Sequence, residues 1–421
     1  MNVEKIIASL QDCPCGRPHE CELKAVECDS GNVNRAGQLL AKHDFPRHIL
    51  LVADENTMAA ADGITLSLDK AGYCVKTKLY KDLRVADMEQ VRELEPLMQD
   101  VDGVLSVGTG SLNDICRLST FRQKKDFAIF ATAPSMDGFA SGSTPITENN
   151  FKVSYTAHQP SVIITDTRIL AASPQVLKSA GFGDMIAKYT GLVDWQVSNL
   201  TTGEYLCKRI FDLTRDALMR IVALADKITQ TDEEAAAAVF ESLVLTGIAM
   251  RVAGCTRPGS GTEHVVSHFW ECKKLEEGHI SDFHGKKCGV ATVLVNRVYH
   301  EMVSREEVEP HEEDLDWDEI RAAYGPRLSA EMMKYNTPTT ITSETTPEIL
   351  KKSWQQIRRI VKEQLPGDAE LLALMKRAGC ATTIEEIGVS PELGALGLKY
   401  HPFMRRRMTL MRLKNMLGFE L

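Results

Sequence analysis

The chain has 421 residues, of which 43% are hydrophobic and 25% charged, the composition of an ordinary globular protein. The net charge of −9 argues against nucleic acid or an anionic membrane surface as the main partner. We find no apolar run of about 18 residues and no signal peptide, which predicts a cytoplasmic protein without a membrane span. A chain of this length can form two hydrophobic cores, so we expect two domains.

The first half of the chain alternates between strand and helix patterns. Short apolar runs predict strands, which lie at 48–53, 73–79, 103–107, 127–132 and 162–165. Periodic patterns between or before them predict helices at 36–42, 57–71 and 87–95. This alternation predicts a parallel sheet with right-handed crossovers, as in a Rossmann-like α/β domain. We place this dinucleotide-binding domain, with a cysteine-rich N-terminal segment, at residues 1–175.

From about residue 174 onward the pattern is helical. The predicted helices lie at 183–196, 204–228, 232–253, 262–275, 286–303, 347–363, 368–377 and 403–417. The acidic run at 306–318 predicts an exposed connection, and Arg405, Arg406 and Arg407 predict a solvated face of the last helix. We find no strong strand pattern here, so residues 176–421 are predicted to form an all-helical second domain.

Three histidines lie close together in the second half of the chain. His264 and His268 are four residues apart, on one face of a predicted helix, and His284 begins the next helical pattern. Neutral imidazole is the commonest metal ligand, so the group is a candidate metal and acid/base site. The alternative is a packed and hydrogen-bonded histidine pair. His279, in the polar run between them, is expected to be a solvated loop residue.

Eleven cysteines, an odd number, are scattered along the chain, which predicts reduced thiols. Four of them, Cys13, Cys15, Cys21 and Cys28, lie near the N-terminus together with His19. This group could hold zinc, but it lacks the paired C-x2-C spacing of structural zinc sites. A reduced surface loop is the alternative that the spacing favours.

Two glycine- and hydroxyl-rich loops follow neighbouring predicted strands. The first, 106–114, leads into a helix, and Gly108 and Gly110 would let a phosphate approach the amides of the helix N-terminus. The third glycine of the dinucleotide fingerprint is missing, so a tight turn without a ligand is the alternative. The second loop, 131–143, belongs at the same edge of the sheet. Together the loops predict one dinucleotide lying across both.

These motifs follow one another in a particular order along the chain. They are Gly108-Thr109-Gly110-Ser111, Asp114, Thr132-Ala133-Pro134-Ser135, Asp137-Gly138, Ser141, Gly183-Asp184, Gly261-Thr262-Glu263-His264, His268 and His284-Gly285. From about residue 35 to the C-terminus, the set resembles the sn-glycerol-1-phosphate dehydrogenases, especially their bacterial branch. The resemblance implies the fold of the dehydroquinate synthase-like and iron-containing alcohol dehydrogenase superfamily. It does not extend to the cysteine-rich start.

The resemblance also implies a role for each matching residue. Contacts to the nicotinamide cofactor would come from Asp54, Gly108, Thr109, Gly110, Ser111, Leu112, Thr132, Ala133, Pro134, Ser135 and Ser141. One divalent ion per chain, zinc or nickel, would be held by Asp184, His264 and His284. The catalytic and substrate contacts would be Asp137, Asp184 and His268. Arg117 stands where many members have lysine, which keeps the charge.

The implied activity is a metal-dependent, NAD(P)-linked oxidoreductase that interconverts dihydroxyacetone phosphate and sn-glycerol 1-phosphate in phospholipid metabolism, as a homodimer. Asp54 favours NAD(H) over NADP(H), because a carboxylate there would accept ribose hydroxyls and repel a 2′-phosphate. The alternatives are another metal-dependent polyol or glycerol dehydrogenase, a dehydroquinate synthase-like lyase, and a nucleotide-binding regulator without chemistry. The lyase fits less well, because residues 131–143 lack the expected glycine-glycine-lysine run. The sequence leaves the identity of the metal and the product configuration open.

Overall fold

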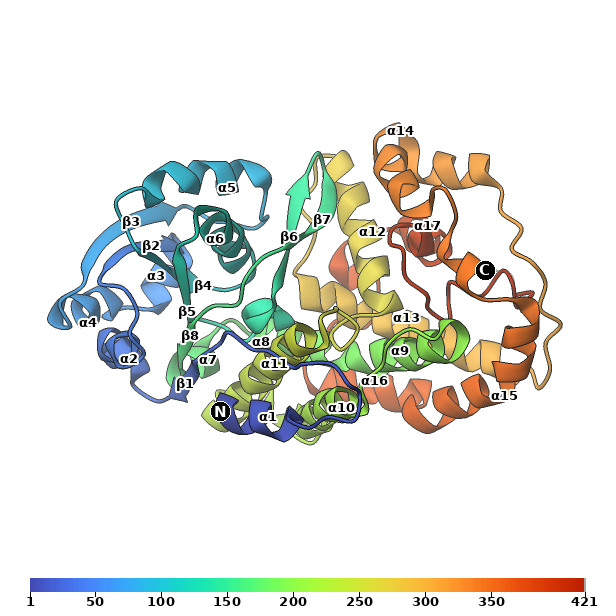
Figure 1. Ribbon diagram of the computed structural model, residues 1–421, viewed down its shortest axis with the longest axis horizontal. Helices are drawn as coiled ribbons and strands as arrows, with labels where there is room; N and C mark the ends of the chain where they lie inside the picture. Colours follow the sequence, from blue (N-terminus) through green and yellow to red (C-terminus); the bar gives the residue numbers. More distant parts are fainter. Residues whose placement is uncertain (420–421) are drawn as a thin grey trace.

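The computed structural model describes residues 1–419, with a parallel sheet at one end and a mass of helices at the other (Figure 1). All neighbouring strands of the six-stranded sheet run parallel, as predicted, and their order is β1-β8-β5-β4-β2-β3. The strands are β1 (Ala25–Asp29), β2 (His48–Asp54), β3 (Cys74–Tyr80), β4 (Gly103–Gly108), β5 (Asp126–Ala131) and β8 (Val162–Asp166).

The central strands are buried and largely apolar because helices cover both faces of the sheet. In β2, Ile49 and Leu51 pack into one core, whereas Leu50 and Val52 pack into another on the opposite face. The first face is covered by α2 (Ala36–Lys42) and α4 (Ile64–Lys70), and the second by α5 (Met88–Leu94) and α6 (Gly110–Gln123). The predicted helix at 57–71 is instead α3 (Glu55–Ala60) and α4, interrupted at Gly63, where φ is +93°.

Helices follow one another after β8, and the predicted domain boundary at 175 falls at the start of one of them. They are α7 (Thr167–Ala172), α8 (Gln175–Ile186), α9 (Lys188–Thr202), α10 (Lys208–Val222), α11 (Glu233–Ala253), α12 (Thr262–Glu276), α13 (His284–Ser304), α14 (Trp317–Asn336), α15 (Pro347–Gln364), α16 (Asp368–Arg377) and α17 (Pro391–Tyr400). The predicted start of α15 is confirmed, with the Thr346 side chain accepting from the Ile349 amide and Pro347 in the first turn. The predicted helix at 183–196 is two helices that meet at Ala187.

Several elements differ from the predictions. Strand β1 was missed because its sequence, Ala-Val-Glu-Cys-Asp, is only weakly apolar, as suits an edge strand. A hairpin of β6 (Ser143–Glu148) and β7 (Phe151–Thr156), standing between sheet and helices in Figure 1, was also missed. The acidic run lies mostly exposed as predicted, but its last residues already belong to α14, which was not predicted.

The predicted helix at 403–417 is wrong, because this segment forms turns apart from a short 3-10 helix ending at Phe403. Its polar groups are bound by other parts of the chain. The Leu410 amide donates to Asp194 Oδ1 at 2.9 Å, and the Arg407 guanidinium donates to the Ser260 carbonyl oxygen at 2.8 Å. Such tertiary hydrogen bonds replace the internal bonds of a helix.

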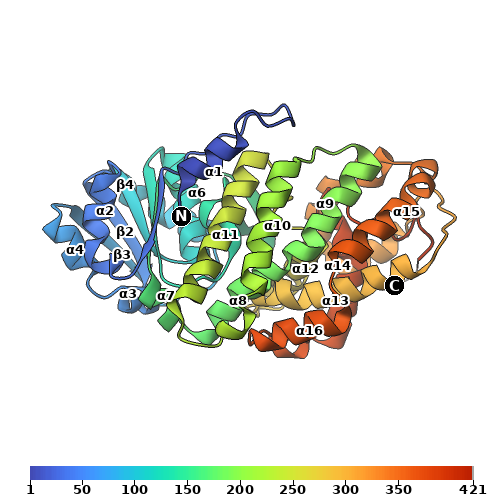
Figure 2. The same ribbon diagram turned by 90° about the horizontal axis from the view of Figure 1, so that it is seen from below.

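By length and composition alone, helix α11 is apolar enough to cross a membrane, although its sequence, with several charged residues, was not predicted as such a segment. It lies against α10 in Figure 2, and 78% of its most apolar window is buried inside the protein. No other helix in residues 1–419 is both long enough and apolar enough to cross a membrane. The burial is that of a core helix.

Candidate active site

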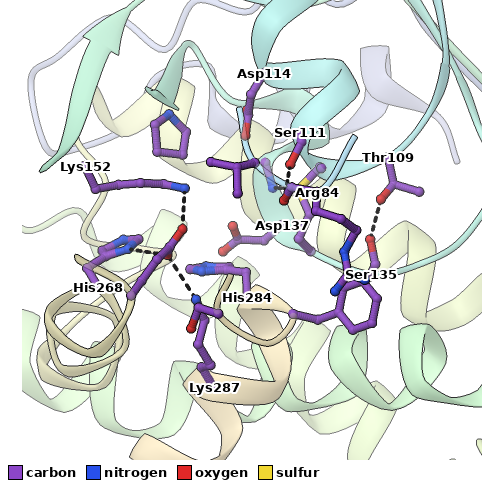
Figure 3. Close-up of a pocket in the computed structure, with 18 of the residues that line it drawn as sticks. Arg84, Thr109, Ser111, Asp114, Ser135, Asp137, Lys152, His268, His284 and Lys287 are labelled. Atoms are coloured by element: carbon purple, nitrogen blue, oxygen red, sulfur yellow. Dashed lines mark hydrogen bonds and ion pairs between the residues drawn. The ribbon is translucent and has the colours of Figure 1, made fainter. Parts of the chain in front are cut away.

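A cavity of about 530 Å³ lies between the carboxyl edge of the sheet and helices α12 and α13 (Figure 3). Its walls come from the β2–α3 turn, the start of α6, the loop after β5, strand β7, both helices, and Arg405 and Arg407. The carboxyl edge of an open α/β sheet is where such folds bind ligands. Side chains from both halves of the chain therefore meet in one concave space.

The two glycine- and hydroxyl-rich loops lie side by side at this edge. Thr109 Oγ1 and Ser135 Oγ are 2.7 Å apart, which joins the loops directly (Figure 3). Helix α6 begins at Gly110, and the Thr109 side chain makes no capping bond to it. The Leu112 amide donates to the Thr109 carbonyl oxygen at 3.1 Å, which leaves the Gly110 and Ser111 amides available to an anion, as a pyrophosphate site requires.

Most of the predicted cofactor residues line the cavity. Those that do are Asp54, Thr109, Gly110, Ser111, Leu112, Thr132, Ser135 and Ser141. Gly108, Ala133 and Pro134 are not among the lining residues. Gly108 has a φ of +154°, which other residues rarely adopt, and a Cβ atom there would also lie 2.5 Å from Leu112 Cδ1, so both conformation and packing favour glycine. Pro134 presents its carbonyl oxygen to α8 at Gly181, where a Cβ atom would lie 1.8 Å away.

Asp54 has a structural role that the sequence reading missed. Its Oδ1 accepts a hydrogen bond from the Thr57 amide at 2.8 Å and so caps α3. The side chain nevertheless lines the cavity, and a carboxylate has a second oxygen to offer a ligand.

Asp184, His264 and His284 come together from α8, α12 and α13. Together with Cys288, their ligand atoms all lie within 4.8 Å of one another. Cys288 was not predicted, although it follows His284 by one helical turn. The helices meet closely because glycines face each other: a Cβ atom on Gly285 would lie 2.0 Å from the Ala180 carbonyl oxygen.

The donor set fits a divalent metal ion. His264 Nδ1 lies 2.8 Å from Glu263 Oε1, which places the proton on Nδ1 and leaves the lone pair of Nε2 free. Nε2 is buried and makes no hydrogen bond among the described residues, while Asp184 Oδ1 lies 3.3 Å away. Burial acts to raise the pKa of Asp184, but Lys188 and His264 hold this pKa well below its ordinary value. A charged carboxylate and neutral imidazoles are the ligands that zinc and similar ions bind.

His268 and Asp137 lie next to this group, in the cavity wall (Figure 3). The His268 ring stacks on His284 with centroids 5.4 Å apart. Burial lowers the pKa of His268 well below its ordinary value, so its imidazole is neutral. The Asp137 amide donates to Asp184 Oδ2 at 2.9 Å, which ties the two predicted substrate contacts together.

Lys188 is a buried residue of the site that the sequence reading missed. Its Nζ donates to Asp137 Oδ2 at 2.6 Å, to Asp184 Oδ1 at 3.2 Å and to the Gly259 carbonyl oxygen at 2.8 Å. Its position four residues after Asp184, on the same face of the predicted helix, could have indicated that it contacts Asp184. The ammonium group fixes both carboxylates in one orientation.

Cationic side chains gather in the cavity beside His268. Lys152 and Lys287 both donate to Glu271, at 2.9 and 3.0 Å (Figure 3). Burial acts to raise the pKa of Glu271, but the two lysines hold this pKa well below its ordinary value. Lys152 was missed because it lies on the unpredicted strand β7.

The prediction for the basic run 405–407 is wrong for two of its three residues. Arg405 and Arg407 line the cavity, whereas Arg406 is exposed. Arg405 donates to the Lys152 carbonyl oxygen at 2.6 Å, and Arg407 donates to Ser260 Oγ at 2.7 Å. Both were misplaced because the segment was predicted as a helix.

The structure also places Arg117 and His279, two residues singled out in the sequence. Arg117 does not line the cavity but donates to the carbonyl oxygens of Gly138, at 2.7 Å, and Phe139, at 2.9 Å, so it fixes the loop before Ser141. His279 is exposed in a loop, as expected.

Comparisons with known proteins agree with this geometry. A family model for iron-containing alcohol dehydrogenases matches residues 27–174. The glycerol-1-phosphate dehydrogenase [NAD(P)+] of Halalkalibacterium halodurans is 32% identical over 295 residues, which cover 68% of this chain and 74% of that protein. The protein of the same name from Geobacillus stearothermophilus is 28% identical over 429 residues, covering 99% of this chain and 98% of the relative.

Solved structures support the fold. An alcohol dehydrogenase from an archaeal halo-thermophilic Red Sea brine pool source has a TM-score of 0.61 and 13% identity, over 94% of this chain and 96% of that one. A probable glycerol dehydrogenase from Sinorhizobium meliloti has a TM-score of 0.53 and 16% identity, over 91% of this chain and 97% of that one. From its sequence relatives, the chain belongs to the glycerol-1-phosphate dehydrogenase family of the iron-containing alcohol dehydrogenases.

Proposed function

We propose that this chain is a metal-dependent, NAD(P)-linked oxidoreductase that interconverts dihydroxyacetone phosphate and sn-glycerol 1-phosphate. One observation carries the proposal: a single cavity contains a free helix N-terminus, the Asp184, His264 and His284 group, and a set of cationic side chains. These three features suit a dinucleotide, a carbonyl group and a phosphate, respectively. The names of the sequence relatives support the same activity.

The cofactor would lie across the two joined loops, with its pyrophosphate at the N-terminus of α6. Asp54, at the end of β2, would accept hydrogen bonds from ribose hydroxyls, which favours NAD(H). A reduced nicotinamide supplies the hydride when bound. The protein orients the cofactor and the substrate within one cavity.

Asp184, His264 and His284 would hold one divalent ion, which when bound would polarise the carbonyl oxygen of the substrate. Lys188 keeps Asp184 and Asp137 in place through its paired hydrogen bonds. In the reduction, the hydride goes to the carbonyl carbon and a proton goes to the oxygen, giving a secondary alcohol. His268, neutral and next to this group, would hydrogen-bond the substrate and move that proton.

The cationic side chains point to a phosphorylated substrate. Lys152 and Arg405 line the cavity near His268, Arg407 lines it beside Ser260, and Glu271 offsets only one of the nearby positive charges. Lys152 is already paired with Glu271, but Arg405 and Arg407 donate only to neutral oxygens of the described residues. An unphosphorylated polyol would leave these two cations without an anionic partner. This is the observation that favours dihydroxyacetone phosphate over free dihydroxyacetone.

We also propose zinc or nickel as the ion, because an aspartate and two histidines suit either metal. A homodimer follows from the family resemblance. A cytoplasmic location is supported by the eleven cysteines, none of which forms a disulfide.

The test is oxidation of reduced cofactor with dihydroxyacetone phosphate compared with free dihydroxyacetone, followed by determination of the product configuration. We expect a kcat/KM at least roughly a hundredfold higher for the phosphorylated ketone, the worth of one or two charge-assisted hydrogen bonds. Equal rates with both ketones would instead indicate a polyol dehydrogenase. No oxidation of cofactor by either ketone, in metal-loaded protein, would contradict the proposal.

A further inference from the structure

The N-terminal segment lies on the helical region and is held there at several points. Helix α1 (Val3–Leu10) lies beside α11 in Figure 2, and the Met1 amino group pairs with Glu241 at 3.1 Å. Arg209, in the first turn of α10, donates to the carbonyl oxygens of Ser9, at 3.2 Å, and Gln11, at 2.9 Å. These contacts set the cysteine-rich loop against the start of α10.

Four side chains meet at this point: Cys13, Cys15 and His19 from the loop, and Cys207 at the N-cap of α10. Their ligand atoms all lie within 4.8 Å of one another. Cys13 Sγ is 3.4 Å from Cys207 Sγ, Cys15 Sγ is 3.3 Å from His19 Nε2, and Cys207 Sγ is 3.9 Å from the same nitrogen. Cys28, in β1, and Cys21 do not belong to the group, so the predicted cluster is corrected at two members.

The distances match those around a tetrahedral zinc ion. Zinc–sulfur bonds of about 2.3 Å and zinc–nitrogen bonds of about 2.0 Å place ligand sulfurs roughly 3.8 Å apart, and sulfur and nitrogen roughly 3.5 Å apart. A disulfide would instead require two sulfurs about 2.0 Å apart. It would also leave the other two side chains without a role.

Neighbouring groups form hydrogen bonds with two of the four ligands and orient them. His19 Nδ1 lies 2.9 Å from the Val252 carbonyl oxygen, which places the proton on Nδ1 and directs the Nε2 lone pair into the group. The Tyr205 hydroxyl donates to Cys15 Sγ at 3.3 Å. Donors of this kind stabilise metal-bound thiolates.

We propose that Cys13, Cys15, His19 and Cys207 bind a second, structural zinc ion. Four protein ligands leave no open position, which is the arrangement of a structural rather than a catalytic site. None of the four side chains lines the active-site cavity. The inference is therefore independent of the proposed dehydrogenase activity.

The ion would fasten the N-terminal segment between the two halves of the fold. On one side of the site, Cys207 belongs to the helical region. On the other, the Lys24 amide donates to the Ser161 carbonyl oxygen at 2.8 Å, and β1 then pairs with β8 at the sheet edge. The chain therefore runs from the zinc site directly into the sheet.

The test is the metal content of the full chain, purified without chelator from zinc-supplemented medium. We expect two metal ions per chain in the wild type. Cys207→Ser and Cys13→Ser should each lose one zinc and retain the second metal. Cys21→Ser, a partly buried cysteine of the same segment outside the group, is the matched control and should retain both.

The wild type alone can overturn the proposal, so it does not depend on the variants folding. One metal ion per chain in the wild type, removed by His264→Ala, would contradict it. So would a Cys13–Cys207 disulfide in the isolated protein, seen as a mass two hydrogens lower, or unchanged metal content in both cysteine variants. Replacement of zinc by cobalt should give a thiolate charge-transfer band that Cys207→Ser weakens and Cys21→Ser leaves unchanged.

Discussion

His264 Nε2 and Asp184 Oδ1 lie 3.3 Å apart, although the residues belong to different helices and are far apart in the sequence. A buried imidazole nitrogen without a hydrogen bond, facing a charged carboxylate, is the arrangement of two ligands of one ion. The first prediction follows from this pair. His264→Ala should remove the active-site ion and lower turnover by roughly 10³-fold or more, because a Lewis acid contributes several kcal/mol.

The measurement is metal content beside kcat. His279→Ala is the control, because His279 is exposed in the loop between α12 and α13. A His264→Ala protein with undiminished metal and activity would remove His264 from the site.

Cofactor choice can be tested at Asp54 without disturbing α3. Asn caps helices about as well as Asp, so Asp54→Asn keeps the cap and removes only the charge. We expect the preference for NADH over NADPH to fall roughly tenfold, about 1.4 kcal/mol, because a 2′-phosphate would no longer be repelled. Glu55→Gln, an exposed neighbour outside the cavity, should leave the ratio unchanged. Wild-type preference for NADPH would contradict the role of Asp54.

His268→Ala should retain metal and cofactor binding but lose catalysis with dihydroxyacetone phosphate. Loss of one positioned proton-transfer or hydrogen-bonding group costs roughly 10²–10⁴-fold in rate. If His268 only packs against His284, the variant would melt at a lower temperature but turn over normally. Steady-state kinetics and a thermal melt on the same preparation separate the two roles.

Arg405 and Arg406 form a matched pair for testing which side chain binds the substrate phosphate. Arg405 lines the cavity and Arg406 does not. Arg405→Gln should raise KM for dihydroxyacetone phosphate roughly 10–100-fold, the worth of one charge-assisted hydrogen bond, and change KM for free dihydroxyacetone little. Arg406→Gln should change neither value. An equal rise for both ketones in Arg405→Gln would indicate a packing role.

His401 should make the fold sensitive to acid. It is buried, its Nδ1 lies 2.8 Å from the Gly397 carbonyl oxygen, and burial lowers its pKa to about 4. Because this pKa is lower in the folded than in the unfolded state, the stabilisation is complete above pH ~6.5 and is lost as the pH falls toward 4. The loss should reach roughly 2–3 kcal/mol by pH ~4.5.

Urea unfolding of the wild type and of His401→Leu, at pH ~6.5 and at pH ~4.5, measures this loss of stability. The other titrating groups are shared, so the difference between the proteins isolates His401. We expect the variant to lose less stability than the wild type on acidification. Equal losses in the two proteins would contradict the role of His401.

The parallel sheet could be predicted because β2, β4 and β5 are buried on both faces and carry apolar runs that need no tertiary context. The spacing of His264 and His268 predicted that both face one site, and both line the cavity, whereas Asp184 could be joined to the histidines only through the family resemblance. Lys152 and Arg405 could not, because their place in the cavity depends on a hairpin and an irregular segment held by tertiary hydrogen bonds. Cys207 could not be assigned to the N-terminal cysteines either, since only the fold brings α10 to that loop.

The contact between α8 and α13 has a consequence for how the protein tolerates mutation. A side chain on Gly285 would meet the Ala180 carbonyl oxygen, and one on Gly183 would meet the Gly285 carbonyl oxygen at 2.7 Å. Either substitution would push the helices apart and separate Asp184 from His284. The site therefore depends on positions that contribute no ligand atom. A random library screened only for metal retention should show these two glycines to be as intolerant of change as the ligands themselves.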